Sequence, residues 1–177
     1  IRQTIERENP IVLSSKPEVS VKDISFIDIN KSSLVDHQFE IHDLENQVAL
    51  TLRQRPAGYI IMPGNSELVE RLKILGLDLI TTNSDLRLDV ERYIIEKSAL
   101  SETQFEGIFP NTVVTRLEKC TKSFPQGSTI VYLDQRNANL AVSVLEPEMD
   151  NGFIYYRVLD AKAGDELPYY RLTNKVR

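Results

Sequence analysis

The sequence predicts an α+β fold, in which a strand-rich mixed sheet contains one β-α-β unit and is accompanied by two short helices. Three observations predict this class. Apolar and polar residues alternate in several segments, as they do in half-buried strands. One short apolar run between two prolines precedes an amphipathic helical stripe. Apolar residues make up 41% and charged residues 27% of the 177 positions, which is the balance of an ordinary globular domain.

Charge and apolar run lengths argue against two classes of partner. Lys and Arg total 21 against 26 Asp and Glu, and the resulting net charge of -5 repels a phosphate backbone. The longest apolar runs, such as residues 59–62, are far shorter than the roughly 20 residues that cross a bilayer. We therefore expect no nucleic-acid partner and no transmembrane segment. The single cysteine, Cys120, cannot form an internal disulfide and gives no evidence on the redox compartment.

The first third of the chain divides into two parts. Because Ile1 is not a start residue, we expect the chain to be a processed product or a piece of a longer one. Residues 1–20 have a charged opening followed by proline and serine, a composition that predicts a linker from a missing upstream domain. Residues 21–55 alternate apolar and polar positions and predict a strand-rich N-terminal portion. The remainder, residues 56–177, is expected to form an α/β accessory domain.

The β-α-β unit is predicted at the start of this accessory domain. Residues 57–62 form an apolar run bounded by prolines, which predicts a short buried strand. A helix over residues 66–75 follows, because Leu68 and Leu72 lie on one apolar stripe and Gly76 provides a C-terminal cap. Residues 78–82 predict a second strand, which would complete the unit through a right-handed crossover.

The later elements are predicted mainly as strands. We expect a strand at residues 86–95, a hairpin of residues 112–119 and 128–133 joined by a turn at 124–127, a second short helix at 139–145, and final strands at 153–159 and 167–172. The helix is expected to be capped by Asn137 or Asn139 and to end at Pro147.

One motif resembles a zinc ligand pair. His37 and Glu40 have the H-x-x-E spacing of zinc carboxypeptidases, in which a third protein ligand, a histidine, lies far downstream. The only other imidazole belongs to His42, and no histidine follows it. We interpret the segment as a solvent-facing strand and expect no metal or other cofactor in this chain.

No set of residues predicts a nucleophilic or nucleotide-dependent enzyme. The chain has no G-x-S-x-G elbow, and its sequence assigns no orienting group to Cys120. Glycine-rich phosphate loops are also absent from the sequence. We therefore assign no catalytic residue.

Two aromatic clusters are candidates for a surface that binds a partner. They are Tyr155-Tyr156-Arg157 and Tyr169-Tyr170-Arg171. Tyrosine and arginine are enriched at interfaces, because they combine a large contact area with polar groups. We favour packing against a neighbouring domain, and the alternative is a platform that binds a ligand such as a glycan or peptide.

Short segments from Arg55 onward occur in an order that is similar to one known family. The segments are Arg55-Pro56, Tyr59-Ile60, Pro63, Leu72-Lys73, Gly76, Phe105-Glu106-Gly107, Ser123-Phe124-Pro125, Gly127-Ser128, Asp134-Gln135, Asn139-Leu140-Ala141, Leu145-Glu146-Pro147-Glu148 and Glu166-Leu167-Pro168-Tyr169-Tyr170-Arg171. Together they resemble the non-catalytic C-terminal region of bacterial zinc carboxypeptidase-like proteins, in the metallocarboxypeptidase family of carboxypeptidase A. The resemblance covers about two thirds of the chain, and residues 1–54 share only the strand-rich character.

This resemblance implies that the chain is an accessory domain, supporting or substrate-orienting, of a zinc metallocarboxypeptidase-like protein involved in proteolysis. The zinc ligands, the general base and the zinc itself would then belong to an upstream catalytic domain of the same chain, which would act on a peptide substrate. The resemblance also implies export, to the periplasm or the cell exterior. The alternative is a stand-alone glycan- or peptide-binding module of a secreted bacterial protein, whereas an independent hydrolase has no assembled site in this sequence.

Overall fold

The computed structural model describes residues 9–176, and the chain divides into two compact units. One unit is Val12–Arg53, which we call the arm. The other contains Gln54–Arg177, which we call the body. Each unit has its own sheet, and the two are described separately below.

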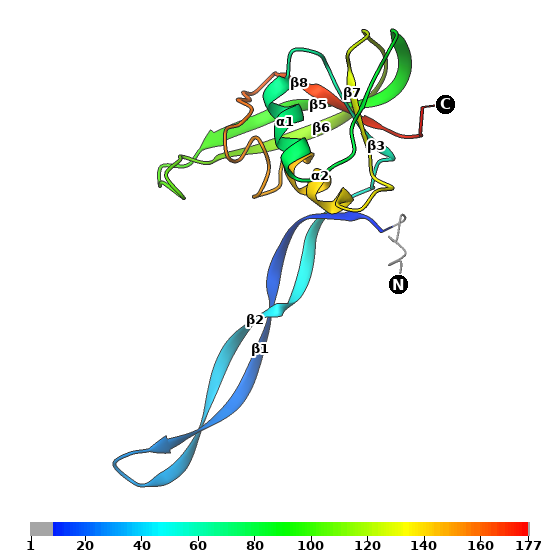
Figure 1. Cartoon of the computed structure of the whole chain (residues 1–177). Helices are drawn as coiled ribbons and strands as arrows, with labels where there is room; N and C mark the ends of the chain where they lie inside the picture. Colours follow the sequence, from blue (N-terminus) through cyan, green and yellow to red (C-terminus); the bar gives the residue numbers. More distant parts are fainter. Residues whose placement is uncertain (1–8, 177) are drawn as a thin grey trace. The chain divides into compact units, whose positions relative to one another are not determined.

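The arm is one long hairpin. Strands β1 (Ile11–Asp28) and β2 (Ser33–Arg53) form a two-stranded sheet, drawn in blue and cyan in Figure 1 as a twisted ribbon. The four-residue turn between them includes Ser32, whose φ of 50° lies in the left-handed region. Residues 11–20, expected as part of a linker, are therefore the first half of a strand. Whether residues 1–20 connect to an upstream domain stays a prediction.

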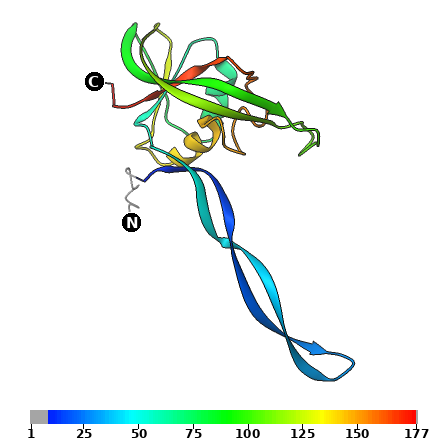
Figure 2. The ribbon, with the colours of Figure 1, turned by 180° about the vertical axis from the view of Figure 1, so that it is seen from behind.

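The body is built on a six-stranded sheet with the order β4-β7-β3-β8-β5-β6. Its strands are β3 (Gly58–Ile61), β4 (Ile80–Thr81), β5 (Leu86–Leu100), β6 (Asn111–Phe124), β7 (Thr129–Tyr132) and β8 (Glu166–Leu172). Every neighbouring pair is antiparallel. Strands β5 and β6 are the longest of the six and lie side by side along their length in Figure 2.

The predicted α+β class is wrong. Strands account for 52% of the chain and helices for 10%, so the fold is mostly β. The sheet is antiparallel rather than mixed, although β3, α1 (Ser66–Ile74) and β4 follow one another as expected. Strand β7 lies between β3 and β4 and runs antiparallel to both, so the two strands are parallel but not neighbours. The local pattern indicates where strands form, whereas their partners depend on contacts distant in sequence.

Two further expectations are corrected by the strand pairing and the turns. Strand β6 pairs with β5, and β7 pairs with β3 and β4, so the expected hairpin of residues 112–119 and 128–133 does not form. Residues 153–159 form turns rather than a strand. Their apolar run is misleading because Phe153 and Ile154 are buried within a turn, where the backbone N–H of Val158 donates to the oxygen of Phe153. The two short helices, α1 and α2 (Ala138–Leu145), lie close to the predicted positions.

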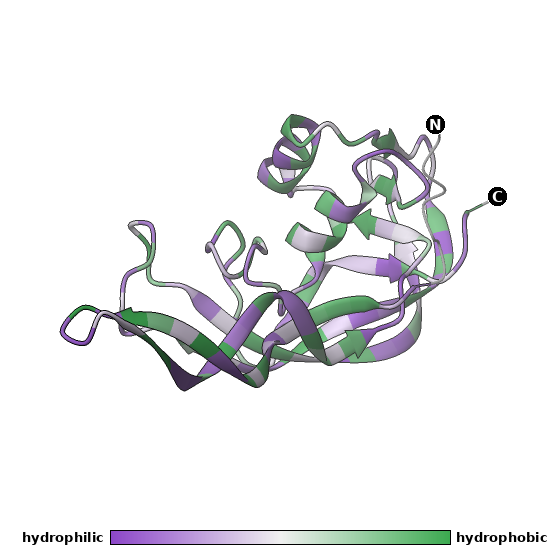
Figure 3. Cartoon of the chain, turned by 90° about the horizontal axis from the view of Figure 1, so that it is seen from below, coloured by the Kyte–Doolittle hydropathy of each residue, from purple (hydrophilic) through white to green (hydrophobic). Residues whose placement is uncertain are grey.

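The core of the body lies on the strands of the six-stranded sheet. A cluster of buried side chains joins five of these strands through Ile60, Val90, Phe124, Ile130, Tyr170 and Leu172. Gly58 is required at the start of β3, because a Cβ there would lie 2.5 Å from the carbonyl oxygen of Val131. In Figure 3, hydrophobic residues recur along the strands with hydrophilic residues between them, as expected for half-buried strands.

Candidate functional site

The structure separates the two tyrosine-arginine clusters. Tyr169, Tyr170 and Arg171 lie in β8, between β3 and β5, and expose 0%, 2% and 2% of their surfaces. They are part of the interior of the body and cannot form an exposed surface of the folded chain. The sequence pattern failed here because polar side chains in an inner strand can be buried when other strands supply their partners.

Arg171 belongs to a buried charged cluster that holds α2 against the sheet. Its Nη1 lies 3.3 Å from Oε1 of Glu146, the fully buried residue that ends α2. Its Nε lies 3.2 Å from Oε2 of Glu91, and its Nη2 donates to the carbonyl oxygen of Gln54. Tyr59 Oη donates to the same Glu146 oxygen at 2.7 Å. Burial and the neighbouring Glu146 raise the pKa of Tyr59 well above its usual value, so this tyrosine remains a neutral donor.

The other cluster lies in a turn segment and contributes to an aromatic patch, which we define as Phe105, Tyr155 and Tyr156. The ring centroid of Tyr155 lies 6.5 Å from that of Phe105 and 5.3 Å from that of Tyr156. Phe105 exposes 50% of its surface, and both tyrosines are half-buried. Arg157 is exposed and its Nε lies 3.5 Å from Oδ1 of Asp160. The structure therefore leaves part of the predicted tyrosine-arginine surface accessible.

Hydrogen bonds fix this patch in place. Tyr156 Oη donates to Oε2 of Glu106 at 3.0 Å, and this bond raises the pKa of Tyr156. The backbone N–H of Asn111 donates to the backbone carbonyl oxygen of Tyr155 at 3.1 Å. The side-chain amide of Asn111 donates to the backbone carbonyl oxygen of Ala161 at 3.0 Å. The turn that bears the tyrosines is thus attached to the end of the β5–β6 hairpin. Sequence reasoning did not assign Phe105 to this surface, because nothing local indicates that it meets Tyr155.

The geometry of the patch limits what it can bind. The ring planes are inclined by 73° between Phe105 and Tyr155 and by 66° between Tyr155 and Tyr156. The three rings pack edge to face and form no flat platform, an arrangement that aromatic rings prefer among themselves. A side chain inserted between inclined rings matches this shape better than a ligand stacked across all three.

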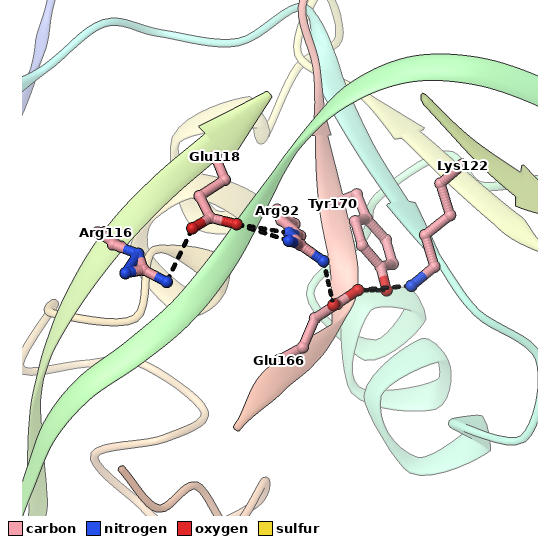
Figure 4. Close-up of polar contacts among 6 residues, drawn as sticks. All are labelled: Arg92, Arg116, Glu118, Lys122, Glu166 and Tyr170. Atoms are coloured by element: carbon pink, nitrogen blue, oxygen red, sulfur yellow. Dashed lines mark hydrogen bonds and ion pairs between the residues drawn. The ribbon is translucent and has the colours of Figure 1, made fainter. Parts of the chain in front are cut away.

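A second polar cluster, shown in Figure 4, lies on β5, β6 and β8 and was missed by sequence reasoning. Arg92 is at its centre, with Nη2 at 2.6 Å from Oε2 of Glu118 and Nη1 at 2.9 Å from Oε2 of Glu166. Lys122 and the hydroxyl of Tyr170 both donate to Oε1 of Glu166. Burial, followed by the bond to Glu166, raises the pKa of Tyr170 to about 12.

This cluster is suited to joining strands rather than to catalysis. The two carboxylate oxygens of Glu166 are engaged by Lys122, Tyr170 and Arg92. Those of Glu118 are engaged by Arg92 and by Arg116 at 2.8 Å. Although burial alone would raise the pKa of Glu166, its bonds to Lys122, Tyr170 and Arg92 lower the pKa overall. An ionised carboxylate with all of its donors in place is poorly disposed to accept a substrate proton.

The H-x-x-E segment does not fit a zinc ion. His37, Glu40 and His42 are all exposed on β2, and Nε2 of His42 lies 3.0 Å from Oε1 of Glu40. Within residues 9–176, no three His, Cys, Asp or Glu side chains are grouped so that they could hold a metal. The described part of the chain also contains no helix with the length and apolar character needed to span a membrane.

The chain is mostly β, and its two charged clusters, around Arg92 and around Arg171, join its own elements to one another. Comparison with curated proteins shows similarity to Carboxypeptidase 2 of Trichophyton equinum and of Trichophyton rubrum, each 27% identical over 172 residues. Those matches cover 97% of this chain and 32% of each relative. Probable carboxypeptidase 2 of Trichophyton verrucosum (strain HKI 0517) is 30% identical over 146 residues, which is 82% of this chain and 28% of the relative.

The chain therefore spans about a third of the length of the relatives that it matches. No family model matches it, and no solved structure matches it. The similarity supports a relationship to one region of proteins named carboxypeptidase 2. These relatives are fungal, so they give no support for the bacterial origin that the sequence resemblance implied.

Proposed function

We propose that this chain is a non-catalytic accessory region of a carboxypeptidase-like protein in the zinc metallocarboxypeptidase family, where it supports the catalytic domain or orients its substrate. The observation that carries the proposal is the asymmetry of coverage. The similarity includes 97% of this chain but leaves about two thirds of each relative unmatched. That unmatched length is sufficient for a separate catalytic domain.

The chemistry of the described residues supports the accessory role. Glu118 and Glu166 are engaged by basic groups, and Glu146 is buried against Tyr59 and Arg171. In this proposal, the catalytic zinc and the peptide substrate are bound by the other part of the polypeptide. We also propose that the protein is exported, because the family resemblance implies an extracellular or periplasmic site of action.

The proposal is tested by comparing this chain with the longer polypeptide encoded by its complete reading frame. The longer polypeptide should release C-terminal residues from a peptide, and a zinc chelator should abolish that activity. This chain alone should have no such activity and should bind well below one equivalent of zinc. Peptide hydrolysis by this chain alone would overturn the proposal, as would a longer polypeptide without carboxypeptidase activity.

A second candidate, a peptide-binding or glycan-binding module, is favoured by the aromatic patch. Its inclined rings and the exposed Phe105 provide an apolar site that the fold does not need for its own core. Phe105→Ala should then weaken binding to a peptide or glycan array, whereas Phe26→Ala, a change of the same type in the arm, should not. Equal binding by both variants and the unaltered chain would exclude the patch as the binding site.

A further inference from the structure

The aromatic patch has a carboxylate at its edge. Glu106 follows Phe105 in the loop between β5 and β6, and its Oε2 accepts from Tyr156 Oη at 3.0 Å. The ring of Phe105 packs on that of Tyr155, which packs on that of Tyr156. These contacts form a closed circuit that gathers three rings and one carboxylate. We call the four residues, Phe105, Glu106, Tyr155 and Tyr156, the acidic aromatic cluster.

The backbone at Glu106 has a conformation that disfavours glutamate. Glu106 and Gly107 form a two-residue turn, in which the backbone groups of Phe105 and Ile108 exchange hydrogen bonds of 2.8 and 3.1 Å. Both turn residues have a positive φ, 48° at Glu106 and 85° at Gly107. Such turns favour asparagine, aspartate or glycine, and a glutamate in the left-handed region is strained. The turn therefore gives no reason for a glutamate, and the reason lies with its side chain.

The hydrogen bond to Tyr156 uses only one oxygen of the Glu106 carboxylate. Glu106 is exposed, and its Oε1 accepts from no donor among the residues that the structure describes. A contact that only fastened the loop would need neither this free oxygen nor a Phe105 side chain that remains 50% exposed. A free carboxylate oxygen beside aromatic rings is suited to a cation, because both attract positive charge.

The segments around the acidic aromatic cluster carry a negative charge. Residues 96–112 and 148–162, which contain the cluster and its neighbours in the sequence, include six acidic and three basic residues. One of the basic residues, Arg157, already lies 3.5 Å from Asp160. This balance attracts a cationic ligand, whereas it repels an anionic ligand or the same surface of a second copy.

Ring geometry and hydrogen bonding select among the possible cations. The rings are inclined by 73° and 66°, so they can contact a compact cation from more than one side. A quaternary ammonium group has no N–H to donate to the free Oε1 of Glu106. The ammonium of lysine can donate but is strongly hydrated, whereas a guanidinium is weakly hydrated, stacks on aromatic rings and has several N–H donors. An arginine side chain therefore suits both the rings and the carboxylate.

We propose that the acidic aromatic cluster binds an arginine side chain of a peptide. The guanidinium donates to Oε1 of Glu106 and lies against the exposed parts of the three rings. This inference rests on the second candidate function, a peptide-binding module, and it names the side chain that the module recognises. It does not depend on the accessory role.

Nuclear magnetic resonance titration of this chain with short peptides tests the proposal. The probe is acetyl-GGRGG-amide, whose blocked ends leave the arginine as its only charge, and the comparison peptides replace that arginine with citrulline, lysine or phenylalanine. The arginine peptide should shift the ring resonances of Tyr155 and Tyr156 with a Kd on the order of 1 mM, because the site is exposed. Citrulline has nearly the same shape without the charge and should bind at least about fivefold more weakly.

Variants of two glutamates in the same loop identify the carboxylate. Glu106→Gln retains an acceptor for Tyr156 but removes the charge, so it should weaken binding of the arginine peptide at least about fivefold. Glu102 is also exposed, and Glu102→Gln is the matched control, which should bind within about twofold of the unaltered chain. Unchanged amide resonances of the six-stranded sheet would show that each variant is folded.

The outcomes separate this inference from the candidate function on which it rests. Equal binding of the arginine and citrulline peptides overturns the inference, as does equal binding by the Glu106→Gln variant and the unaltered chain. Ring shifts with the phenylalanine peptide alone overturn the inference and leave a peptide-binding module standing. No shift with any of the four peptides also overturns the inference, whereas the array measurement decides on the candidate function separately.

Discussion

Glu146 joins two other buried side chains in the interior of the body. Its carboxylate accepts from Tyr59 and pairs with Arg171, and all three side chains are buried. Glu146→Gln preserves the shape but removes one of the two carboxylates that pair with Arg171, so that Glu91 alone balances its charge. We expect a loss of about 1.5 to 3 kcal/mol in the free energy of unfolding, the usual contribution of a hydrogen bond to a charged group.

Urea denaturation of the unaltered chain and of the Glu146→Gln variant measures the loss of unfolding free energy. Glu102→Gln, the same substitution at an exposed loop position, is the control and should change the free energy by less than about 0.5 kcal/mol. Equal midpoints for the two variants would show that the buried charge of Glu146 contributes nothing specific.

Tyr170 gives the body a defined response to alkaline pH. Its folded-state pKa of about 12 lies above the usual value of 10.0, so folding favours the protonated phenol. The contribution of Tyr170 to stability is therefore complete below pH 10 and is lost as the pH rises toward about 12. Tyr59 and Tyr93 also have raised pKa values, so the test compares the unaltered chain with its Tyr170→Phe variant. The difference in unfolding free energy between these two proteins should change as the pH rises from 10 to about 12. A difference that stays constant over this pH range would contradict the raised pKa of Tyr170.

Residue-scale predictions from the sequence failed where burial depends on distant partners. Tyr169-Tyr170-Arg171 has the composition of an interface, yet it lies inside the body. The ring of Tyr169 packs on Tyr93, that of Tyr170 packs on Phe124, and Arg171 pairs with Glu146. Tyr155 and Tyr156 have a similar local sequence and remain partly accessible. The two clusters differ in the strands around them, which no local pattern specifies.

Among the elements, α1 was the best predicted. Leu68 and Leu72, placed on one stripe by sequence spacing, are its buried residues. Leu72 is fully buried, so Leu72→Ala leaves a cavity and should cost about 2 to 5 kcal/mol. Ile74 on the same helix exposes 83% of its surface, and Ile74→Ala should change stability by less than about 0.5 kcal/mol. Urea midpoints that shift equally for both variants would show that the stripe does not face the core.

Strand pairing is the property of the elements that the sequence could not supply. The run at β3 and the helix after it are visible in the apolar pattern, whereas the insertion of β7 between β3 and β4 is not. The turn at residues 124–127 suggested a hairpin, but the chain crosses there from β6, at one edge of the sheet, to β7 near the other. Turn chemistry predicts a reversal of direction and does not identify the strand that is met afterwards.

For the whole molecule, the sequence predicts a relationship to carboxypeptidases, which the comparisons support, whereas the accessory role stays a prediction. The family resemblance pointed toward carboxypeptidases, and the comparisons support a relationship to one part of such proteins. The sequence predicts a separate strand-rich portion at residues 21–55, because the proline and serine of residues 11–20 indicate a linker, whereas the arm begins at Val12. Strand β1 contains Pro17 in a two-stranded sheet, where each strand has a free edge and a missing backbone donor is tolerated.

The central claim is that this chain assists a catalytic domain and does not itself perform the reaction. The most direct measurement is the rate of release of a C-terminal residue from a peptide by the longer polypeptide lacking this region, with the bound zinc determined on the same sample. The account predicts that the shortened protein retains the metal and measurable hydrolysis, with a lower thermal midpoint or a higher KM than the longer polypeptide. Loss of the metal and of all hydrolysis from a shortened protein that remains folded would contradict it.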